Sequence, residues 1–249
     1  MKISLYVIPG SHPGVAARRM LEHKGLPYRR IDLPPAFSRR LIKLFGFAGD
    51  RTPAMKVDGR KVQGSTEISR ELDRLQPDPP LFPADPERRR AVEEAERWGS
   101  DEFQEIPRKI SWWALKRRKA DQASFLDGAR LGLPTSVLVA TSGPIVRRAI
   151  RLNNSTDEVV SGSIASLPAA LDRVDALIAE GVLNGDQLNA ADFQLGTTVR
   201  LLMSFADLEP AIAARPAGKL AERVQPELSG RIGPAFPQEW LAPLKTPVG

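Results

Sequence analysis

Residues 51–72, RTPAMKVDGRKVQGSTEISREL, change their pattern twice within a short span. Two short strand-like runs flank Asp58 and Gly59, and Asp-Gly in such a position is a strong signal for a β-hairpin. From Ser65 onward the apolar residues take helical spacing, so a helix follows the second strand directly. A serine at this junction caps the helix, helps the helix N-terminus to hold an anion, or does both.

Strand-like and helical patterns alternate in the residues before this stretch. The predicted elements are a strand at 2–8, a helix at 13–25, a strand at 27–35 and a helix at 36–49. Strands joined through a helix run parallel, whereas the strands of a hairpin run antiparallel. The order β-α-β-α-β-β-α therefore predicts an α/β domain with a thioredoxin-like fold, in which helices cover both faces of a mixed four-stranded sheet.

A proline-dense stretch, QPDPPLFPADPERRR at 76–90, separates this domain from the rest of the chain. Proline lacks a backbone N–H and interrupts both helices and central strands, so the stretch predicts a linker. Asp85 followed by Pro86 is typical of a helix start, and the segments beyond have three-four apolar spacing throughout. The predicted organisation is a thioredoxin-like domain at 1–77, a linker at 78–85 and an all-helical domain at 86–249.

One later helix start has a stronger signal than the others. In GDQLNAADFQLGTTVRLL, Asn189 precedes an apolar helical run and Asp192 stands three residues further on. This spacing is a variant of the capping box, in which the cap and the third helical residue bond each other's backbone amides. We expect it to start a buried helix.

Composition excludes several classes of function. The chain has 249 residues, a formal net charge of +6, no cysteine and two histidines, so a disulfide, a thiolate metal site or a cysteine nucleophile is excluded and no metal is expected. Basic residues are interspersed with acidic ones, which argues against a nucleic-acid partner. No apolar run approaches the roughly 20 residues of a spanning helix, and the N-terminus lacks a signal-peptide pattern, so the expectation is a cytoplasmic protein with no membrane insertion.

Four segments, in this order and spacing, make the chain resemble the cytosolic glutathione S-transferase family. They are LYVIPGSHPGVAARRMLEHKGLPY, RTPAMKVDGRKVQGSTEISREL, LFPADPERRRAVEEAERW and GDQLNAADF. The resemblance implies an enzyme that uses glutathione, or a related low-molecular-weight thiol, as cosubstrate and attacks a hydrophobic electrophile, without a prosthetic group. It also implies a homodimer. A non-catalytic ligand-binding or protein-interaction module of the same fold is the alternative.

The resemblance carries the family's glutathione contacts onto the hairpin region. Pro53 falls on the family's cis-proline, and the backbone of Thr52 would pair with the cysteinyl part of glutathione. Ser65 falls on the serine that meets the γ-glutamyl carboxylate at a helix N-terminus, where free N–H groups and the helix dipole attract anions. Gly64 stands where the family has an acid or an amide, which puts that one contact in doubt. Arg51 matches a basic position that meets the glycyl carboxylate.

The family's catalytic hydroxyl lies just after the first strand. Counting back from Arg18, which matches an arginine of the family's first helix, places Ser11 at this position. A hydroxyl donor next to a helix N-terminus lowers the pKa of a bound thiol and so stabilises its thiolate. Ser11 is equally suited to be a plain helix cap. Tyr6 is the rival, although it is out of register and faces the sheet, and His12 is expected in a loop.

The helical domain would supply the pocket for the electrophile, with Trp112 and Trp113 as candidates. Adjacent residues on a helix point about 100° apart, so only one of the two faces a pocket squarely. Both could instead belong to the core or to a dimer interface. The basic residues 116–119 are expected on a solvated face, and a nucleic-acid or membrane contact through WWALKRRK is the remaining alternative.

Overall fold

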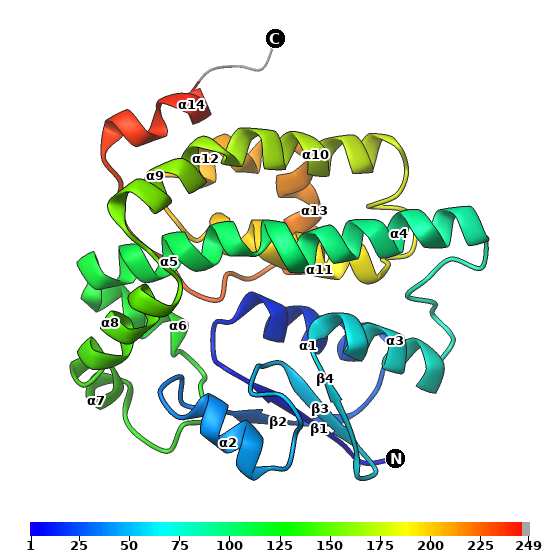
Figure 1. The fold of residues 1–249 in the computed structure, drawn as a ribbon. Helices are drawn as coiled ribbons and strands as arrows, with labels where there is room; N and C mark the ends of the chain where they lie inside the picture. Colours follow the sequence, from blue (N-terminus) through cyan, green and yellow to red (C-terminus); the bar gives the residue numbers. More distant parts are fainter. Residues whose placement is uncertain (246–249) are drawn as a thin grey trace.

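The computed structural model describes residues 1–245, and its N-terminal part is built around a mixed four-stranded sheet (Figure 1). The strands are β1 (Ile3–Val7), β2 (Tyr28–Asp32), β3 (Ala54–Val57) and β4 (Arg60–Gln63), in the spatial order β2-β1-β3-β4. Strand β1 is parallel to β2 and antiparallel to β3, and β3 and β4 form the antiparallel hairpin. The predicted order and directions are confirmed.

Three helices cover this sheet on two faces: α1 (His12–His23), α2 (Ser38–Leu44) and α3 (Ser65–Leu75). Successive residues of a strand point to opposite faces, so Leu5 packs with the core under α1 and α3 while Tyr6 packs with Ile42 of α2. The ring of Tyr6 contacts Phe45 and Phe47 at centroid distances of 5.0 and 5.4 Å. Tyr6 therefore faces the α2 side, away from the helical part of the chain.

The second part is a helical layer that lies against α1 and α3 (Figure 1). Its longest member is a single rod made of α4 (Pro86–Trp98), a π-helical turn (Gly99–Phe103) and α5 (Glu105–Arg117). Pro107 lacks an N–H and its ring would crowd the carbonyl four residues earlier, which disfavours regular α-helix before it. The backbone shifts register there, and the Gln104 N–H bonds the Gly99 carbonyl at 3.1 Å.

The remaining helices follow along the chain, with 3-10 turns at Lys119–Asp121 and Gln238–Leu241. They are α6 (Gln122–Phe125), α7 (Thr135–Ala140), α8 (Gly143–Leu152), α9 (Asp157–Ala165), α10 (Leu167–Ala179), α11 (Ala190–Leu202), α12 (Glu209–Ala213), α13 (Pro216–Val224) and α14 (Ala242–Lys245). Every residue of α11 is buried, so this helix is the centre of the layer. The predicted capping box is present at its start, with Asn189 and Asp192 bonding each other's amides.

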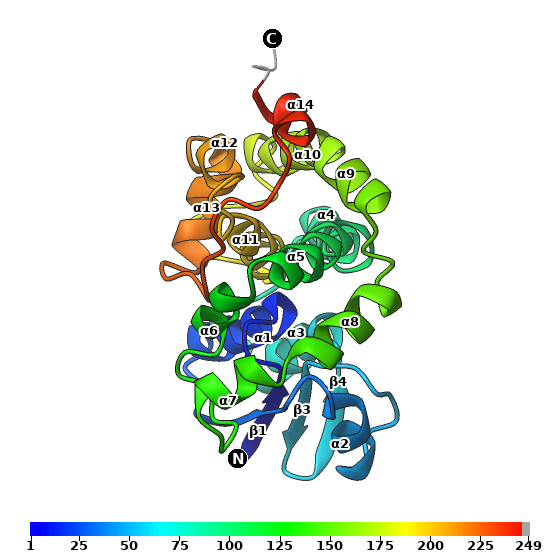
Figure 2. The same ribbon diagram turned by 90° about the vertical axis from the view of Figure 1, so that its left-hand side faces the viewer.

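One stretch leaves the helical layer and runs down beside the sheet (Figure 2). It comprises residues 119–152, with α6, α7 and α8, and we call it the descending segment. Two hydrogen bonds tie it to β2: Arg30 donates to the Gly128 carbonyl at 2.6 Å, and the Arg130 amide donates to Asp32 at 2.8 Å. The two parts of the chain are therefore joined along β2 as well as across α1.

A buried lysine ties the start of the connection between the two parts to the first domain. The Lys24 side chain has no exposed surface, and its ammonium group contacts Asp73 at 3.0 Å and the carbonyls of Gln76 and Pro79 at 2.6 and 2.5 Å. A buried ammonium needs such partners because desolvation is costly. Neither helix nor strand lies between Leu75 and Pro86.

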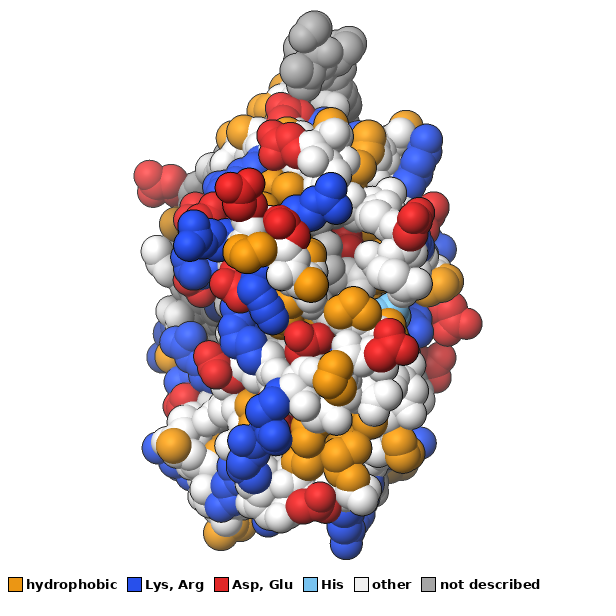
Figure 3. Space-filling model, turned by 90° about the vertical axis from the view of Figure 1, so that its right-hand side faces the viewer, with side chains coloured by type: hydrophobic (Ala, Val, Ile, Leu, Met, Phe, Trp, Pro, Cys, Tyr) orange, Lys and Arg blue, Asp and Glu red, His pale blue; other side chains and the backbone are white. Residues whose placement is uncertain are grey.

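The face formed by α3 and α4 has charges of both signs (Figure 3). Ion pairs there join Arg60 and Arg74 to Glu71, Arg70 to Glu96, and Arg89 to Asp73. Because these charges are paired and interspersed, this face does not have the uniformly positive potential that would attract nucleic acid. Among residues 1–245, no helix is both long and apolar enough to cross a membrane.

Candidate functional site

The start of β3 and the start of α3 are held next to each other by one backbone hydrogen bond. The Gly64 N–H donates to the Pro53 carbonyl at 2.9 Å. The Thr52–Pro53 peptide bond is cis, as predicted. Gln63 holds the loop before it, accepting from the Gly49 amide at 2.8 Å and donating to the Arg51 carbonyl at 2.7 Å. The residues expected to contact glutathione thus lie together around one helix start, with Arg51 exposed and Thr52 half-buried.

The helix start itself differs from the expectation that Ser65 caps it. Gly64 occupies the N-cap position and Ser65 is the first helical residue, so the cap prediction is wrong by one residue. Ser65 is buried, and within residues 1–245 its hydroxyl makes no hydrogen bond. The first amides of a helix have no partner within the helix. An uncommitted hydroxyl beside free amides is suited to bind an anion.

Gly64 has a backbone conformation that explains why no side chain stands there. Its φ is 100° and its ψ is 146°, a region that is essentially restricted to glycine. The space around it is open, because a Cβ at this position would meet nothing within 4 Å. Backbone geometry rather than crowding therefore excludes the family's usual acid or amide from this position.

Ser11 occupies the N-cap position of α1, yet its side chain forms no capping bond. Its backbone is held by two hydrogen bonds, from its own N–H to the Ile8 carbonyl at 3.1 Å and from the Val15 N–H to its carbonyl at 2.9 Å. Within the described residues its hydroxyl has no hydrogen-bond partner. Ser11 and Ser65 therefore both present an uncommitted hydroxyl at the start of a helix.

The sequence predicted His12 in a loop, and this prediction is wrong. His12 is the first residue of α1 and is buried. Burial, together with the positive charge of Arg108, lowers the pKa of its imidazole to about 3. Its Nε2 has no hydrogen-bond partner among residues 1–245. The imidazole is therefore neutral near pH 7. A single histidine in a Gly-Ser-His-Pro run offers no signal of this burial.

Phe125 of the descending segment covers the loop that leads to Ser11. A Cβ on Gly10 would lie 3.1 Å from the Phe125 ring, and one on Gly230 would lie 2.6 Å from it. The Phe125 ring therefore packs between two glycines from distant parts of the chain. This contact closes one side of the β1–α1 loop.

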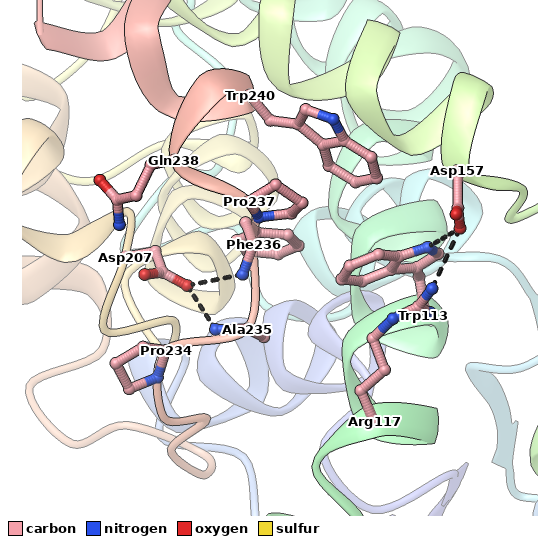
Figure 4. A pocket seen from close by; sticks show the side chains of 10 residues that line it. All are labelled: Trp113, Arg117, Asp157, Asp207, Pro234, Ala235, Phe236, Pro237, Gln238 and Trp240. Carbon is pink, nitrogen blue, oxygen red and sulfur yellow. Dashed lines mark hydrogen bonds and ion pairs between the residues drawn. The ribbon is translucent and has the colours of Figure 1, made fainter.

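The two candidate tryptophans have different environments. Trp113 is buried and belongs to an aromatic cluster, with ring centroids 5.5 Å from Phe236 and 5.1 Å from Trp240 (Figure 4). Its Nε1 donates to Asp157 at 2.7 Å, and this bond is the main cause that lowers the pKa of that carboxyl. Trp112 is half-buried and lies outside this cluster.

Trp113 lines an open cavity of about 440 Å³ on the outer side of the helical layer. The Arg117 guanidinium carbon lies 3.5 Å from the centroid of its ring, and Asp157, which bonds both residues, also lines the cavity (Figure 4). None of the residues expected to contact glutathione lines this cavity. The cavity is thus separate from the helix starts at Ser11 and Ser65.

Metal-binding capacity can be stated for the described part of the chain only. Residues 1–245 hold no group of three or more His, Cys, Asp or Glu side chains placed to bind a metal ion.

The comparisons with known proteins agree with this architecture. Residues 5–80 match the family model for the glutathione S-transferase N-terminal domain. Solved structures match across most of the chain, and the chain as a whole has the glutathione S-transferase fold, a thioredoxin-like domain followed by helices. A comparison with curated proteins gave no match.

Three of the similar structures show how far the sequence has diverged. A glutathione S-transferase from Rhodospirillum rubrum has a TM-score of 0.61 and 18% identity, covering 91% of this chain and 89% of its own. One from Methylobacterium radiotolerans, in complex with glutathione sulfonate, has a TM-score of 0.55 and 20% identity, with 92% of each chain covered. The β-etherase LigF from Sphingobium sp. has a TM-score of 0.60 and 21% identity, covering 90% and 100%. At these identities the likeness shows the fold.

Proposed function

We propose that this protein is a glutathione transferase-like enzyme that binds glutathione, or a related low-molecular-weight thiol, at the junction of β1, β3 and α3. The observation that carries the proposal is the 2.9 Å bond from Gly64 to Pro53, because it sets the cis peptide beside the start of α3. The Thr52 backbone can then pair with the peptide part of the thiol while the α3 amides and Ser65 receive a carboxylate. The fold and the bound glutathione analogue of one similar structure support this assignment.

Ser11 is the proposed catalytic residue. A free thiol has a pKa of about 8.5, and a hydroxyl donor with a helix N-terminus behind it lowers that value. The Ser11 hydroxyl is not engaged in capping α1, so it is available to donate to a thiolate. The chain would raise the thiolate fraction and hold it in position, and the thiolate would attack an electrophilic carbon and displace its leaving group.

Binding and turnover test the proposal separately. Calorimetric titration of the full chain with glutathione is expected to show one saturable site per chain, and Ser65→Ala is expected to weaken it about tenfold through loss of a charge-assisted hydrogen bond. Ser142→Ala is the matched control, because that hydroxyl bonds only the Val139 carbonyl. Absence of glutathione binding at about 10 mM would contradict the proposal.

Turnover distinguishes the enzyme from a non-catalytic module of the same fold. With an activated aryl halide as electrophile, Ser11→Ala is expected to lower kcat by about 10²-fold and to raise the pKa of the bound thiol, measured from thiolate absorbance against pH. Glutathione binding without any turnover across a panel of electrophiles would favour the ligand-binding alternative.

The assembly, location and domain limits of the protein remain proposals of the same kind. We propose a homodimer in the cytoplasm, with domains divided at the proline-rich linker 78–85 and an apolar substrate pocket near Trp112 and Trp113. Light scattering coupled to size exclusion tests the dimer, which would have twice the 27.3 kDa chain mass.

A further inference from the structure

A second cavity, of about 250 Å³, lies beside the β1–α1 loop and is lined by residues from both parts of the chain. Residues 7–11, the first two turns of α1 and the end of β2 form one wall. Residues within 124–129 and 225–229 form the other. Thr52, Pro53 and Ser65 do not line it, whereas Ser11 does, so the cavity adjoins the proposed thiol site at Ser11 but lies outside its β3–α3 part. We call it the interlayer cavity.

The wall of the interlayer cavity is strongly polar. Three arginines line it, Arg18 and Arg19 from α1 and Arg30 from β2, and each keeps only 24–29% of its side chain exposed. Asp32 of β2 lines it as well, and its side chain is 1% exposed. Partly enclosed guanidinium groups facing one space make it attractive to an anionic group.

Unpaired polar atoms are concentrated at this cavity. Ten buried side-chain nitrogen and oxygen atoms in residues 1–245 have no hydrogen-bond partner, and four of them belong to residues that line it: Nε of Arg18, Arg19 and Arg30, and Oδ1 of Asp32. Most buried polar groups in folded proteins have a partner in the protein or in bound solvent or ligand. Nε of Arg18 lies 3.5 Å from Oε1 of Glu22 in an ion pair. The other three atoms, around one cavity, call for a polar occupant.

Arg30 and Asp32 show which atoms are left for that occupant. They are two residues apart on β2 and so project from the same face of the sheet. Nη2 of Arg30 and Oδ2 of Asp32 bond each other at 2.9 Å and also bind Gly128 and Arg130 of the descending segment. The pair thus uses one atom from each side chain to hold the fold, which leaves a donor at Nε and an acceptor at Oδ1.

The remaining atoms define the ligand by its chemistry. The Nε donors of Arg19 and Arg30 require an acceptor, and a carboxylate matches the planar guanidinium group. The free oxygen of Asp32 requires a donor, and the exposed Asp127 and Glu227 at the rim add further negative charge. These acidic groups disfavour a phosphate dianion but favour an ammonium group beside the carboxylate. We propose that the interlayer cavity binds the α-amino carboxylate group of a small molecule.

Two sources could supply this group, a free amino acid or the γ-glutamyl end of a glutathione molecule. Titration of the full chain with three probes of matched size tests the shared chemistry: L-norvaline, pentanoate, which lacks the ammonium group, and butylamine, which lacks the carboxylate. Norvaline is expected to bind saturably, and each of the other two at least tenfold more weakly. Failure of norvaline to bind at about 10 mM would mean that the cavity holds water only and would overturn the proposal.

Variants assign the binding to this cavity. Asp32→Asn is expected to weaken norvaline at least tenfold and to leave pentanoate unchanged, because only the ammonium group meets Asp32. Arg19→Gln is expected to weaken both probes at least fivefold, and it spares the Arg30–Asp32 tether because Arg19 pairs only with Glu22 of its own helix. Arg39→Gln is the control, since its ion pair with Asp50 lies outside the cavity.

The outcomes separate the two sources and do not depend on transferase activity. Competition between norvaline and glutathione that is lost in Arg19→Gln would show that the γ-glutamyl end uses the cavity in place of the start of α3 assigned to it under the proposed function. Independent binding would show that the cavity takes a separate amino acid. Either result upholds the proposal. Norvaline affinity that is unchanged in Arg19→Gln would overturn it, and if Asp32→Asn does not fold, Arg19→Gln alone decides.

Discussion

The ring of Phe125 packs directly against Gly10, so that a Cβ on Gly10 would lie only 3.1 Å from the ring atom Cδ1. Gly10 also has a φ of 74°, so two independent features require glycine there. The contact joins the descending segment to the loop that carries Ser11. It places the geometry of the proposed catalytic hydroxyl under the control of a residue more than a hundred positions away in sequence.

Gly10→Ala is expected to destabilise the protein by about 2 kcal/mol, because a left-handed backbone costs a non-glycine residue 1–2 kcal/mol and the added methyl group also displaces the ring. Urea unfolding measures this. Gly128→Ala is the matched control, with a similar φ of 64° but open space around it, and it should cost less. Equal losses in the two variants would contradict a role for the Phe125 contact.

His12→Leu is expected to flatten the dependence of stability on acid pH. The pKa of His12 falls to about 3 in the folded chain from 6.5, so the unfolded chain binds the proton more tightly. Stability is then lost as pH falls below 6.5. The wild-type protein should lose about 3 kcal/mol from this group between neutral pH and about pH 4, and the variant should lack that part of the slope. Identical slopes in urea unfolding across this range would contradict the buried neutral imidazole.

Asp192→Asn is expected to destabilise the protein at every pH, but less at neutral pH than in acid. Asp192 accepts from the amides of Asn184 and Asn189 at 2.7 and 2.8 Å, and an amide side chain can replace only one of these acceptors. The expected cost is about 2 kcal/mol. Burial raises the pKa of Asp192 to about 6, so the folded chain binds its proton more tightly, and the carboxyl loses stability as pH rises from 3.8 to 6.

The Asp192→Asn variant lacks this titration. The difference between its free energy of unfolding and that of the wild type should therefore shrink between about pH 4 and pH 7. Urea unfolding at both ends of the range measures the two deficits. A deficit that grows with pH would mean that the carboxylate is stabilised rather than penalised by its surroundings.

Gly64→Gln is expected to destabilise the protein without strengthening glutathione binding. The side chain would restore the amide that the family places there, but the glycine-restricted backbone costs about 1–3 kcal/mol for any other residue. Gly64→Ala provides the control for the backbone cost alone. A Gln variant that is as stable as wild type and binds glutathione more tightly would show that this backbone adapts freely.

The fold was largely predictable because its signals are local. The Asp58-Gly59 turn, the capping pair of Asn189 and Asp192, and the strand and helix periods each depend on neighbouring residues, and their order identifies the sheet. The cis peptide before Pro53 could be placed only through the resemblance. Its neighbours Arg51, Thr52 and Ser65 did come together in space.

The features that the sequence did not predict depend on contacts between distant segments, which local patterns do not encode. Nothing in the run Pro9 to Pro13 shows that His12 is buried or that the charge of Arg108 in α5 acts on it. Likewise, Arg30 and Asp32 appear in the sequence as ordinary polar residues of a strand, and their pairing with Gly128 and Arg130 depends on where the descending segment runs. The helix cap at Gly64 was missed by one residue because serine is the commoner cap and glycine is chosen there for its φ.

The π-helical turn at 99–103 has a consequence for the helix that follows. One extra residue in a helix rotates everything after it by about 100°, so each residue of α5 takes the direction that its predecessor would have in an unbroken α-helix. Trp113, rather than Trp112, therefore points into the aromatic cluster and reaches Asp157. The choice between two adjacent tryptophans is therefore made about three helical turns upstream. If residues 99–103 formed regular α-helix with no residue removed, Trp112 would take the direction that Trp113 has now.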